Sequence, residues 1–314
     1  MPAYVGEVYA PRHSPHFAAC RRAVRFLSGS PGSVIGLSGG PDSLALVAAC
    51  AAEGIAAEAV VVDHQLQEGS GEVAARAAAI ARRLGIPARV VTVDVDGVGG
   101  MEASAREARY EALRVAAGGR PILVAHTMDD QAETYLLSSL RGHASAMREV
   151  TGDIIRPFLG LRRAETVGCC EELGLDYWQD PHNEREEYRR VAVRKQVVPL
   201  LAQVGGGDAV PALARAGVQA AADDELLGEM ASSISNDCRE LADAPEPLRR
   251  RWLVRWVADA GAEATESTLR DLDALITDWH GQGPIYLGSQ LAVRRRNGRL
   301  ETIQQPPGRP STHA

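Results

Sequence analysis

Short apolar segments alternate with longer amphipathic segments from the start of the chain to about Gly174. The short segments are rich in Val, Ile and Ala, which is typical of buried strands, and they lie at residues 33–37, 59–63, 88–95, 122–125 and 154–157. The longer segments have helical spacing of apolar residues, and they lie at residues 16–27, 44–52, 71–84, 102–117, 130–140 and 162–173. Ser70 is placed to cap the third of these helices. The alternation predicts a doubly wound, parallel α/β sheet.

The pattern changes after Gly174, where a polar stretch precedes a helix at residues 189–202 and three consecutive glycines at 205–207. Glycine runs of this kind favour a break between elements. Beyond it the pattern predicts mainly helices, at 211–242, from Pro247 onward and at 268–279, and then strands at 285–287, 291–295 and 300–303. Asn297-Gly298 predicts a hairpin turn. We therefore expect two domains, at 1–204 and 205–305, and a disordered tail at 306–314.

Composition narrows the range of functions. The 314 residues include 45% apolar residues, enough for a packed core in each of two domains. The net charge of −7 gives no general attraction to nucleic acid or to anionic membranes, so a nucleic-acid site would have to be a local cluster of arginines. The five cysteines form no C-x-x-C pair, and no run approaches the roughly 18 apolar residues of a spanning helix. These features are those of a cytoplasmic protein without membrane contact.

The chain is organised around a glycine loop between the first predicted strand and the helix that follows it. Its residues are Ser38, Gly39, Gly40, Pro41, Asp42 and Ser43. A strand, a glycine turn and a helix in this order direct backbone N–H groups and the positive helix end at an anion such as phosphate. The two glycines allow positive φ angles, the serines add hydroxyl donors, and proline suits the first helical turn.

Asp42 is the unexpected member of this loop, because a carboxylate repels phosphate. It is explained if a divalent cation, usually Mg²⁺, lies between the carboxylate and the phosphates. The loop is not a Walker A motif, since the only lysine of the chain is Lys195, and it is not a G-x-G-x-x-G motif. The alternative is an ordinary strand-to-helix turn without a ligand.

Two further strands end in polar residues, Asp63-His64 and His126. Because the carboxyl ends of parallel strands meet at one edge of a sheet, we expect these residues to converge with Ser38 at a ligand site. His126 could instead be a structural histidine at a strand end.

Several of these motifs resemble known families. The loop resembles the S-G-G-x-D-S signature of the PP-loop ATP pyrophosphatases, which cleave ATP between the α and β phosphates and have an adenine nucleotide alpha hydrolase-like fold. Residues 126–134 (H-T-M-D-D-Q-A-E-T) resemble the H-T-x-D-D-Q-x-E-T block of tRNA(Ile)-lysidine synthetases. Similar matches occur, in the order of the family, at 62–64 (V-D-H), 105–110 (A-R-E-A-R-Y), 156–165 (R-P-F-L…R-R-A-E) and 180–183 (D-P-H-N). The resemblance covers about residues 33–200.

The chain departs from the family pattern at three places. Residues 143–147 replace a glycine-rich segment of the family, residues 190–194 keep only the outer arginines of R-N-R-x-R, and Gln67 stands where the family has Arg. Longer members also carry a further C-terminal domain. We therefore expect the contacts to tRNA to differ from those of the longer members.

The resemblance implies a two-step ligation. ATP adenylates the C2 oxygen of the wobble cytidine in the CAU anticodon of an isoleucine tRNA, and free L-lysine then attacks C2 through its ε-amine and displaces AMP, which gives lysidine. The loop, with Asp63 and His64, would bind ATP, and Asp42 with Asp129 or Asp130 would hold Mg²⁺.

The remaining implied roles concern the other substrates. Asp129, Asp130 and Glu133 would receive lysine and the released proton, and His126 would contact a phosphate or the metal. Arg109 and Arg194 would contact phosphate, the lysine carboxylate or tRNA, with Arg189 and Arg190 as further tRNA contacts.

Plainer interpretations stay open for several of these residues. Asp129 or Asp130 could cap its helix, and the cluster of basic residues at 189–195 could be a solvated helix face. In the later helix, Leu248, Trp252 and Trp256 are expected in the core, and Arg249, Arg250 and Arg251 either lie on the surface or bind phosphates.

Three other functions fit parts of the pattern. A 2-thiocytidine thiolase of the same fold usually needs C-x-x-C cysteines, and a glutamine-dependent amidotransferase needs a glutaminase domain that residues 1–32 are too few to form. A non-catalytic protein that binds adenosine nucleotides would not need the acidic motif at residues 126–134, so that motif argues against this alternative. A homodimer is compatible with the sequence.

Overall fold

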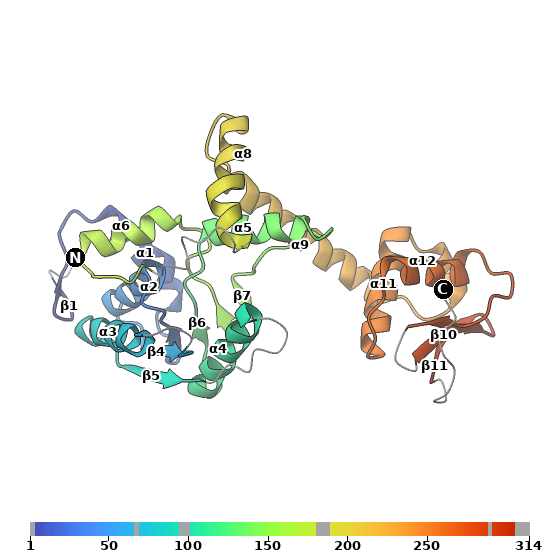
Figure 1. Cartoon of the computed structure of the whole chain (residues 1–314), viewed down its shortest axis with the longest axis horizontal. Coiled ribbons are helices and arrows are strands. Elements are labelled where there is room, and N and C mark those ends of the chain that lie inside the picture. Colours follow the sequence, from blue (N-terminus) through green and yellow to red (C-terminus); the bar gives the residue numbers. More distant parts are fainter. Residues whose placement is uncertain (1–3, 66–68, 94–100, 180–188, 288–290, 305–314) are drawn as a thin grey trace. The chain divides into compact units, whose positions relative to one another are not determined.

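The computed structural model describes residues 4–65, 69–93, 101–179, 189–287 and 291–304. Gln67, the segment 180–183 and the predicted tail at 306–314 lie outside these ranges. The chain divides into two compact units, Met1–Ala220 and Ala221–Ala314, and each is described by itself (Figure 1). The domain boundary expected at 204/205 lies before helix α9, whereas the division between the units lies within it.

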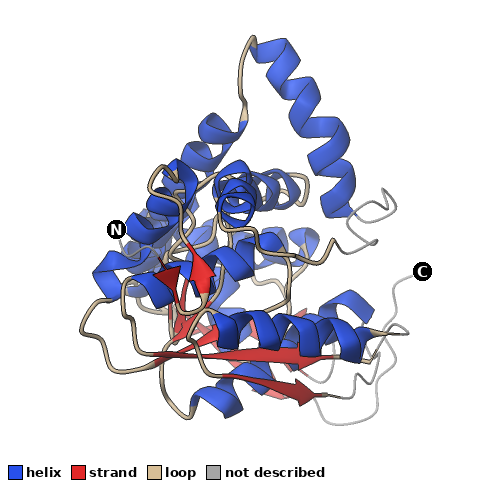
Figure 2. Ribbon diagram, turned by 90° about the vertical axis from the view of Figure 1, so that its left-hand side faces the viewer, coloured by secondary structure: helices blue, strands red, loops and turns tan. Residues whose placement is uncertain are grey.

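A sheet covered by helices forms the centre of the first unit (Figure 2). It has six strands in the order β5-β4-β3-β6-β8-β7. The strands are β3 (Ser33–Gly36), β4 (Ala57–Asp63), β5 (Ala88–Thr92), β6 (Ile122–Leu123), β7 (Val150–Thr151) and β8 (Ile154–Ile155). All pairs are parallel except β7 with β8. The predicted parallel α/β sheet is confirmed. Its strand order reverses beside β3, at the position where open α/β sheets bind ligands.

The two faces of the sheet follow the alternation of its strand residues. Ile35 and Val61 face one core, which contains helices α1 (Pro15–Val24), α2 (Pro41–Ala52), α3 (Ser70–Arg83) and α6 (Arg163–Glu172). Their neighbours Val34 and Val60 face the other core, beneath α4 (Met101–Ala117). Successive strand residues point to opposite faces, so one apolar run supplies both cores. The carboxyl ends of β3, β4 and β6 are thereby held at one edge.

Helix ends account for most local differences from the predicted elements. Helix α3 begins at Ser70, with Gly69 as its N-cap at a φ of 82°, so the predicted Ser70 cap is wrong. Helix α5 (Met128–Ser139) begins before the predicted residue 130 because Thr127 caps it. The first predicted helix ends at Val24 and continues as a 3₁₀ turn, Arg25–Leu27. The short strands β1 (Tyr4–Val5) and β2 (Val8–Tyr9) were not predicted.

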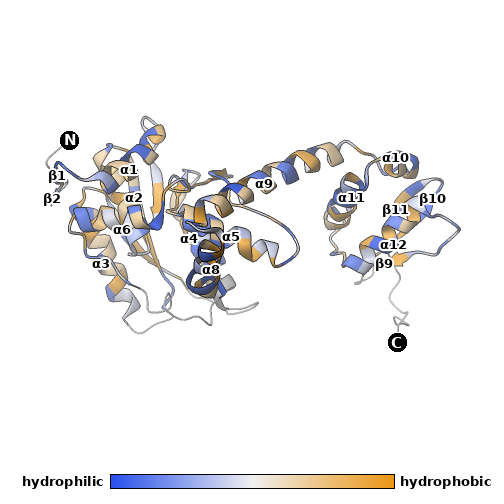
Figure 3. Ribbon diagram, turned by 90° about the horizontal axis from the view of Figure 1, so that it is seen from above, coloured by the Kyte–Doolittle hydropathy of each residue, from blue (hydrophilic) through white to orange (hydrophobic). Residues whose placement is uncertain are grey.

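The last part of the first unit is helical. Its elements are α7 (Arg189–Ala192), a π-helical turn (Val193–Val197), α8 (Val198–Gly205) and the first part of α9 (Val210–Ser232). Helix α9 mixes hydrophobic and hydrophilic residues along its length (Figure 3). The predicted glycine break is confirmed, because Gly206 ends α8 with a φ of 69°. Gly217 of α9 lies against α5, where an added Cβ would come within 3.1 Å of the Tyr135 Cβ.

The second unit packs three helices against an antiparallel sheet. The helices are α10 (Cys238–Asp243), α11 (Glu246–Asp259) and α12 (Glu266–Thr277), and the strands are β9 (Ile285–Tyr286), β10 (Leu291–Arg296) and β11 (Arg299–Gln304) in the order β11-β10-β9. Asn297 and Gly298 have φ angles of 51° and 76°, which suits the predicted hairpin turn. Trp252 is buried and donates its indole N–H to the Ile234 carbonyl at 2.8 Å, as expected for a core residue.

The arginines of α11 are bound to carboxylates of the same unit. Arg249 is 8% exposed and donates to Asp273 at 2.5 Å, Arg250 donates to Glu266, and Arg251 donates to Asp224 at 2.8 Å. Arg249 is therefore a structural residue. The other two guanidinium groups have their charges neutralised locally, which makes this helix a poor phosphate-binding surface.

Within the described ranges, no single helix is both long and apolar enough to cross a membrane, and one pair of helices bent by 101° meets that test only when its two members are counted together. All five cysteines are buried free thiols.

Candidate functional site

The glycine loop has the geometry of an anion-binding turn. Gly39 has a φ of 86°, and an added Cβ would lie 3.2 Å from the Ala77 Cβ, so only glycine fits there without strain. Gly40 is the N-cap of α2 and Pro41 follows in its first turn. The Ser43 hydroxyl donates to the Gly40 carbonyl at 3.0 Å and accepts the Ser38 N–H at 3.2 Å. The loop is thus fixed by its own hydrogen bonds before any ligand arrives.

A cavity of about 300 Å³ opens beside this loop at the carboxyl edge of β3, β4 and β6. Its walls are apolar side chains from the strands and α4, and its polar rim consists of Ser38, Asp42, Ser43, His64, Arg109, Tyr110, His126 and Asp130. The structure therefore brings together loop, strand-end and helix residues far apart in sequence. Asp63 lines a neighbouring cavity of about 490 Å³, where its carboxylate accepts the Gln65 N–H at 3.0 Å.

Several polar atoms around the first cavity are buried without a hydrogen-bond partner among the described residues. They are His64 Nδ1, the Tyr110 hydroxyl and His126 Nδ1. Burial lowers the pKa of His126 to about 4, so the ring is neutral at physiological pH, and burial also lowers the pKa of His64. Unsatisfied buried groups of this kind are expected where a ligand completes the hydrogen bonding.

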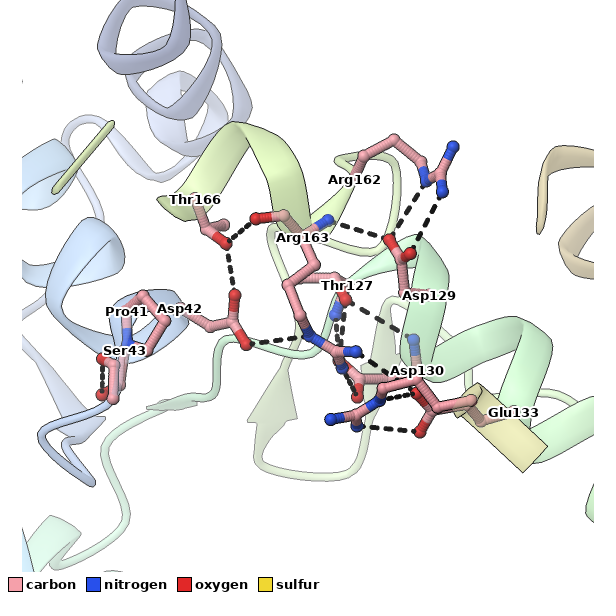
Figure 4. Close-up of polar contacts among 12 residues, drawn as sticks. Pro41, Asp42, Ser43, Thr127, Asp129, Asp130, Glu133, Arg162, Arg163 and Thr166 are labelled. Atoms are coloured by element: carbon pink, nitrogen blue, oxygen red, sulfur yellow. Dashed lines mark hydrogen bonds and ion pairs between the residues drawn. The ribbon is translucent and has the colours of Figure 1, made fainter. Parts of the chain in front are cut away.

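Asp42 points from the first turn of α2 toward α6 (Figure 4). Its carboxylate accepts a hydrogen bond from the Thr166 hydroxyl and lies 3.7 Å from the Arg163 Nε. Burial raises the pKa of Asp42 to about 6, although Arg163 and Thr166 act in the opposite direction. An ionised Asp42 is therefore only partly compensated by the protein itself, which is the condition for accepting a further cation.

Asp130 and Glu133 of α5 both contact the side chain of Arg163, the first residue of α6. Arg163 donates through Nη2 to Asp130 Oδ1 at 2.6 Å and through Nη1 to Glu133 Oε1 at 3.3 Å. The second oxygen of Asp130 accepts the Thr127 N–H at 2.7 Å and completes a capping box. The N-cap of α5 is Thr127, so the interpretation of Asp129 or Asp130 as the cap is wrong. One oxygen of Asp130 supports that cap, while the other faces the site.

Asp129 turns away from this cluster, although it precedes Asp130 in the same helix. Its carboxylate accepts the Arg163 backbone N–H at 2.8 Å and two hydrogen bonds of 3.1 Å from the Arg162 guanidinium. It therefore stabilises the N-terminus of α6 from outside that helix. Burial alone would raise the pKa of Asp129, but the hydrogen bonds and charges of Arg162 and Arg163 hold it below its usual value.

Glu133 is 1% exposed and is surrounded by arginines. Arg194 donates to it at 2.7 and 3.3 Å, and Arg190 lies 3.9 Å away. Two of the arginines suggested as tRNA contacts therefore face the acidic cluster, whereas Arg189 is exposed. Arg109 lies in the cavity wall against the Tyr110 ring.

Comparison with known proteins identifies the family of the chain. A family model described as a PP-loop domain matches residues 18–201, and one described as the TilS substrate binding domain matches residues 237–301. The tRNA(Ile)-lysidine synthase of Corynebacterium glutamicum is 47% identical over 97% of this chain and 98% of its own length. That of Corynebacterium diphtheriae is 49% identical over 92% of this chain and 97% of its own. The chain belongs to the tRNA(Ile)-lysidine synthase family.

A solved structure adds support for the fold alone. The U34-tRNA thiolase of Methanococcus maripaludis has a TM-score of 0.51 and 17% identity, and the match covers 67% of this chain and 84% of the thiolase. Family membership, together with five buried thiols, removes the thiolase alternative for this chain.

A cation site in this member of the family would depend on Asp42 and Asp130. Among the described residues, no group of three or more His, Cys, Asp or Glu side chains is arranged to hold a metal ion. Mg²⁺ usually takes one or two carboxylates and completes its shell with phosphate oxygens and water. The two carboxylates fit such a site only when a phosphate is present.

Three residues of the site were not predicted from the sequence: Arg162, Arg163 and Thr166. The R-R-A-E segment was recognised as a family motif, but it carried no sign of which acids its arginines contact. That information comes from packing, because the N-terminus of α6 lies against both α2 and α5.

Proposed function

We propose that this single site carries out both steps of lysidine formation, with ATP in the cavity beside the glycine loop and lysine at the acidic cluster next to it. The family to which the chain belongs consists of ATP-dependent ligases that modify tRNA. The observation that carries the proposal is the position of Asp42, Asp130 and Glu133 around one guanidinium at the rim of the cavity. The anion-binding glycine loop and the acids that could bind a cation thereby lie next to each other.

The first step would use the loop and the cavity. Backbone N–H groups of the loop and the positive end of α2 suit the β and γ phosphates, and the apolar walls suit the adenosine. The cytidine O2 attacks the α phosphorus as the bond to the pyrophosphate oxygen breaks. Asp42 and Asp130 would hold Mg²⁺, which would supply positive charge against the phosphates, and Arg109 lies in the wall of the same cavity.

The second step would use the acidic cluster. The lysine ε-amine attacks C2 of the adenylated cytidine, the bond from C2 to the AMP oxygen breaks, and the amine loses a proton. Asp130 and Glu133 are paired with arginines in the nucleotide-free protein, so the cationic amino acid would replace an arginine partner at these acids. A carboxylate beside the amine can then accept the proton. Most of the rate enhancement would come from positioning, because the site holds both reactants next to each other.

The tRNA would be held mainly through exposed arginines. Arg189 is exposed near the site, and Arg296 and Arg299 are exposed on the hairpin of the second unit, within the match to the TilS substrate binding domain. Guanidinium groups suit planar contacts to phosphates and bases. The named relatives are tRNA(Ile)-lysidine synthases, and the motif resemblance implies that the substrate is the isoleucine tRNA with a CAU anticodon.

Separating the two steps tests the assignment. Asp42→Asn should abolish transfer of labelled AMP to tRNA, whereas Glu133→Gln should still adenylate tRNA in the absence of lysine but transfer labelled lysine poorly. Glu111→Gln is a suitable control, because Glu111 lies on the surface of α4 with a side chain that is 69% exposed. Loss of adenylation in Glu133→Gln with unchanged lysine affinity would move Glu133 to the ATP side and overturn the division.

A further inference from the structure

Arg163 occupies the centre of the site, although nothing in its own helix favours an arginine there. It is the first residue of α6, where the helix end is positive and a cation is unfavourable. Its side chain is only 22% exposed and contacts carboxylates from two other helices (Figure 4). The side chain of Arg163 is therefore held in this position by those carboxylates.

The contacts of Arg163 coincide with the groups that would bind the divalent cation. Its Nε lies 3.7 Å from Asp42 Oδ2 and its Nη2 lies 2.6 Å from Asp130 Oδ1. The remaining oxygens of both acids are engaged, since Asp42 Oδ1 accepts from Thr166 and Asp130 Oδ2 accepts from Thr127. A metal ion that used the two inward oxygens would have to take the position of the guanidinium.

We propose that Arg163 is an internal counter-ion that holds the place of the divalent cation in the nucleotide-free protein and yields it when the cation arrives with ATP. This inference rests on the proposed role of Asp42 and Asp130 as the metal-binding acids. The phosphates of ATP give the displaced guanidinium a new anionic partner, so its charge stays paired after the exchange. A cation that arrives alone brings no such partner and must displace Arg163 without compensation.

The neighbouring arginine provides a matched control. Arg162 contacts Asp129 and Asp208 and shares the same helix end, but it contacts neither of the metal-binding acids. If Arg163 merely fastened α6 to α5, Arg162→Met and Arg163→Met would have similar effects. A counter-ion role instead predicts a change in metal binding for Arg163 alone.

The test is binding of Mn²⁺ without nucleotide, measured by electron paramagnetic resonance of free Mn²⁺. The wild type and Arg162→Met should bind Mn²⁺ weakly, and Arg163→Met should bind it at least about tenfold more tightly, because a positive charge is removed from two facing carboxylates. The gain should disappear in Arg163→Met/Asp42→Asn. Circular dichroism checks folding, and Arg163→Gln replaces the methionine variant if that variant does not fold, with the same expected gain.

Two results would overturn the inference: Mn²⁺ affinity in the Arg163 variant equal to that of the wild type, or a gain that persists in the double variant. A second measurement separates this failure from failure of the proposed function. With a non-hydrolysable ATP analogue present, Asp42→Asn should weaken Mn²⁺ binding. If it does and the Arg163 variant shows no gain, only the counter-ion role is wrong, and if Asp42→Asn has no effect, the metal assignment itself is wrong.

Discussion

Replacing Asp42 by Asn should stabilise the nucleotide-free protein while it removes activity. Asn keeps the size of the side chain and an oxygen that can accept the Thr166 hydrogen bond, and Arg163 keeps Asp130 and Glu133 as partners. What the substitution removes is a buried negative charge whose desolvation raises the pKa from 3.8 to about 6. The site is thus strained electrostatically until a cation is bound.

The size and the pH range of the effect follow from the pKa. An acid whose pKa is higher in the folded than in the unfolded state destabilises the fold once it is ionised, at every pH above about 6, and this cost fades as the pH falls toward 3.8. A shift of roughly two units corresponds to at most about 3 kcal/mol at neutral pH, and to about 1 kcal/mol near pH 4.5. The side chain is 25% exposed, so solvent will reduce the measured value.

The assay is thermal unfolding of wild type and Asn variant, followed by circular dichroism without nucleotide or metal. The variant should melt higher by roughly 5 to 10 °C at neutral pH and by clearly less at about pH 4.5, given about 2 to 4 °C per kcal/mol for a unit of this size. Adding Mg²⁺ with ATP should raise the melting temperature of the wild type more than that of the variant. The reasoning is refuted if the variant melts lower than the wild type at neutral pH, or if the difference does not change with pH.

Three further changes test other parts of the structure. Arg249→Ala should lower the free energy of unfolding of the second unit by about 2 to 3 kcal/mol, because Asp273 loses its partner. Replacing the exposed Arg250 by Ala should leave the denaturation midpoint unchanged. Tryptophan fluorescence in denaturant measures both variants, and equal effects would contradict the burial argument. Replacing Arg296 and Arg299 by Ala should flatten the log–log salt dependence of tRNA binding by about 1.5 and spare ATP affinity, and an unchanged slope would move the tRNA contacts elsewhere. Gly39→Ala should weaken ATP binding and destabilise the fold by about 1 to 2 kcal/mol, measured by calorimetry and thermal unfolding, and wild-type values would argue against the strained turn.

The parts of the fold set by periodic patterns could be predicted from the sequence. The central strands β3 and β4 are largely apolar; Ser38 follows β3 and Asp63 ends β4. The topology of parallel sheets then places these strand ends together. The paired strands β7 and β8 have two residues each, too few to show a period, and β7 was missed because Val150-Thr151 is exposed.

The candidate site divides in the same way between local and non-local information. The glycine loop and Asp42 could be recognised because a strand, a turn and a helix are consecutive in sequence. The different orientations of Asp129 and Asp130 could not, because both lie in one helical turn and only the packing of α6 gives each a different partner. Arg194 was expected at phosphate, at the lysine carboxylate or at tRNA. In the structure its guanidinium pairs with Glu133, because a charge pattern does not identify the partner of a long side chain.

The most direct test of the central claim is nucleoside analysis of tRNA after incubation with the purified protein, ATP, Mg²⁺ and labelled lysine. We expect lysidine at the wobble position of an isoleucine tRNA with a CAU anticodon, one pyrophosphate released for each lysine incorporated, and no product when that cytidine is replaced by uridine. Pyrophosphate release without lysine in the tRNA, or labelling that survives replacement of the cytidine, would contradict it.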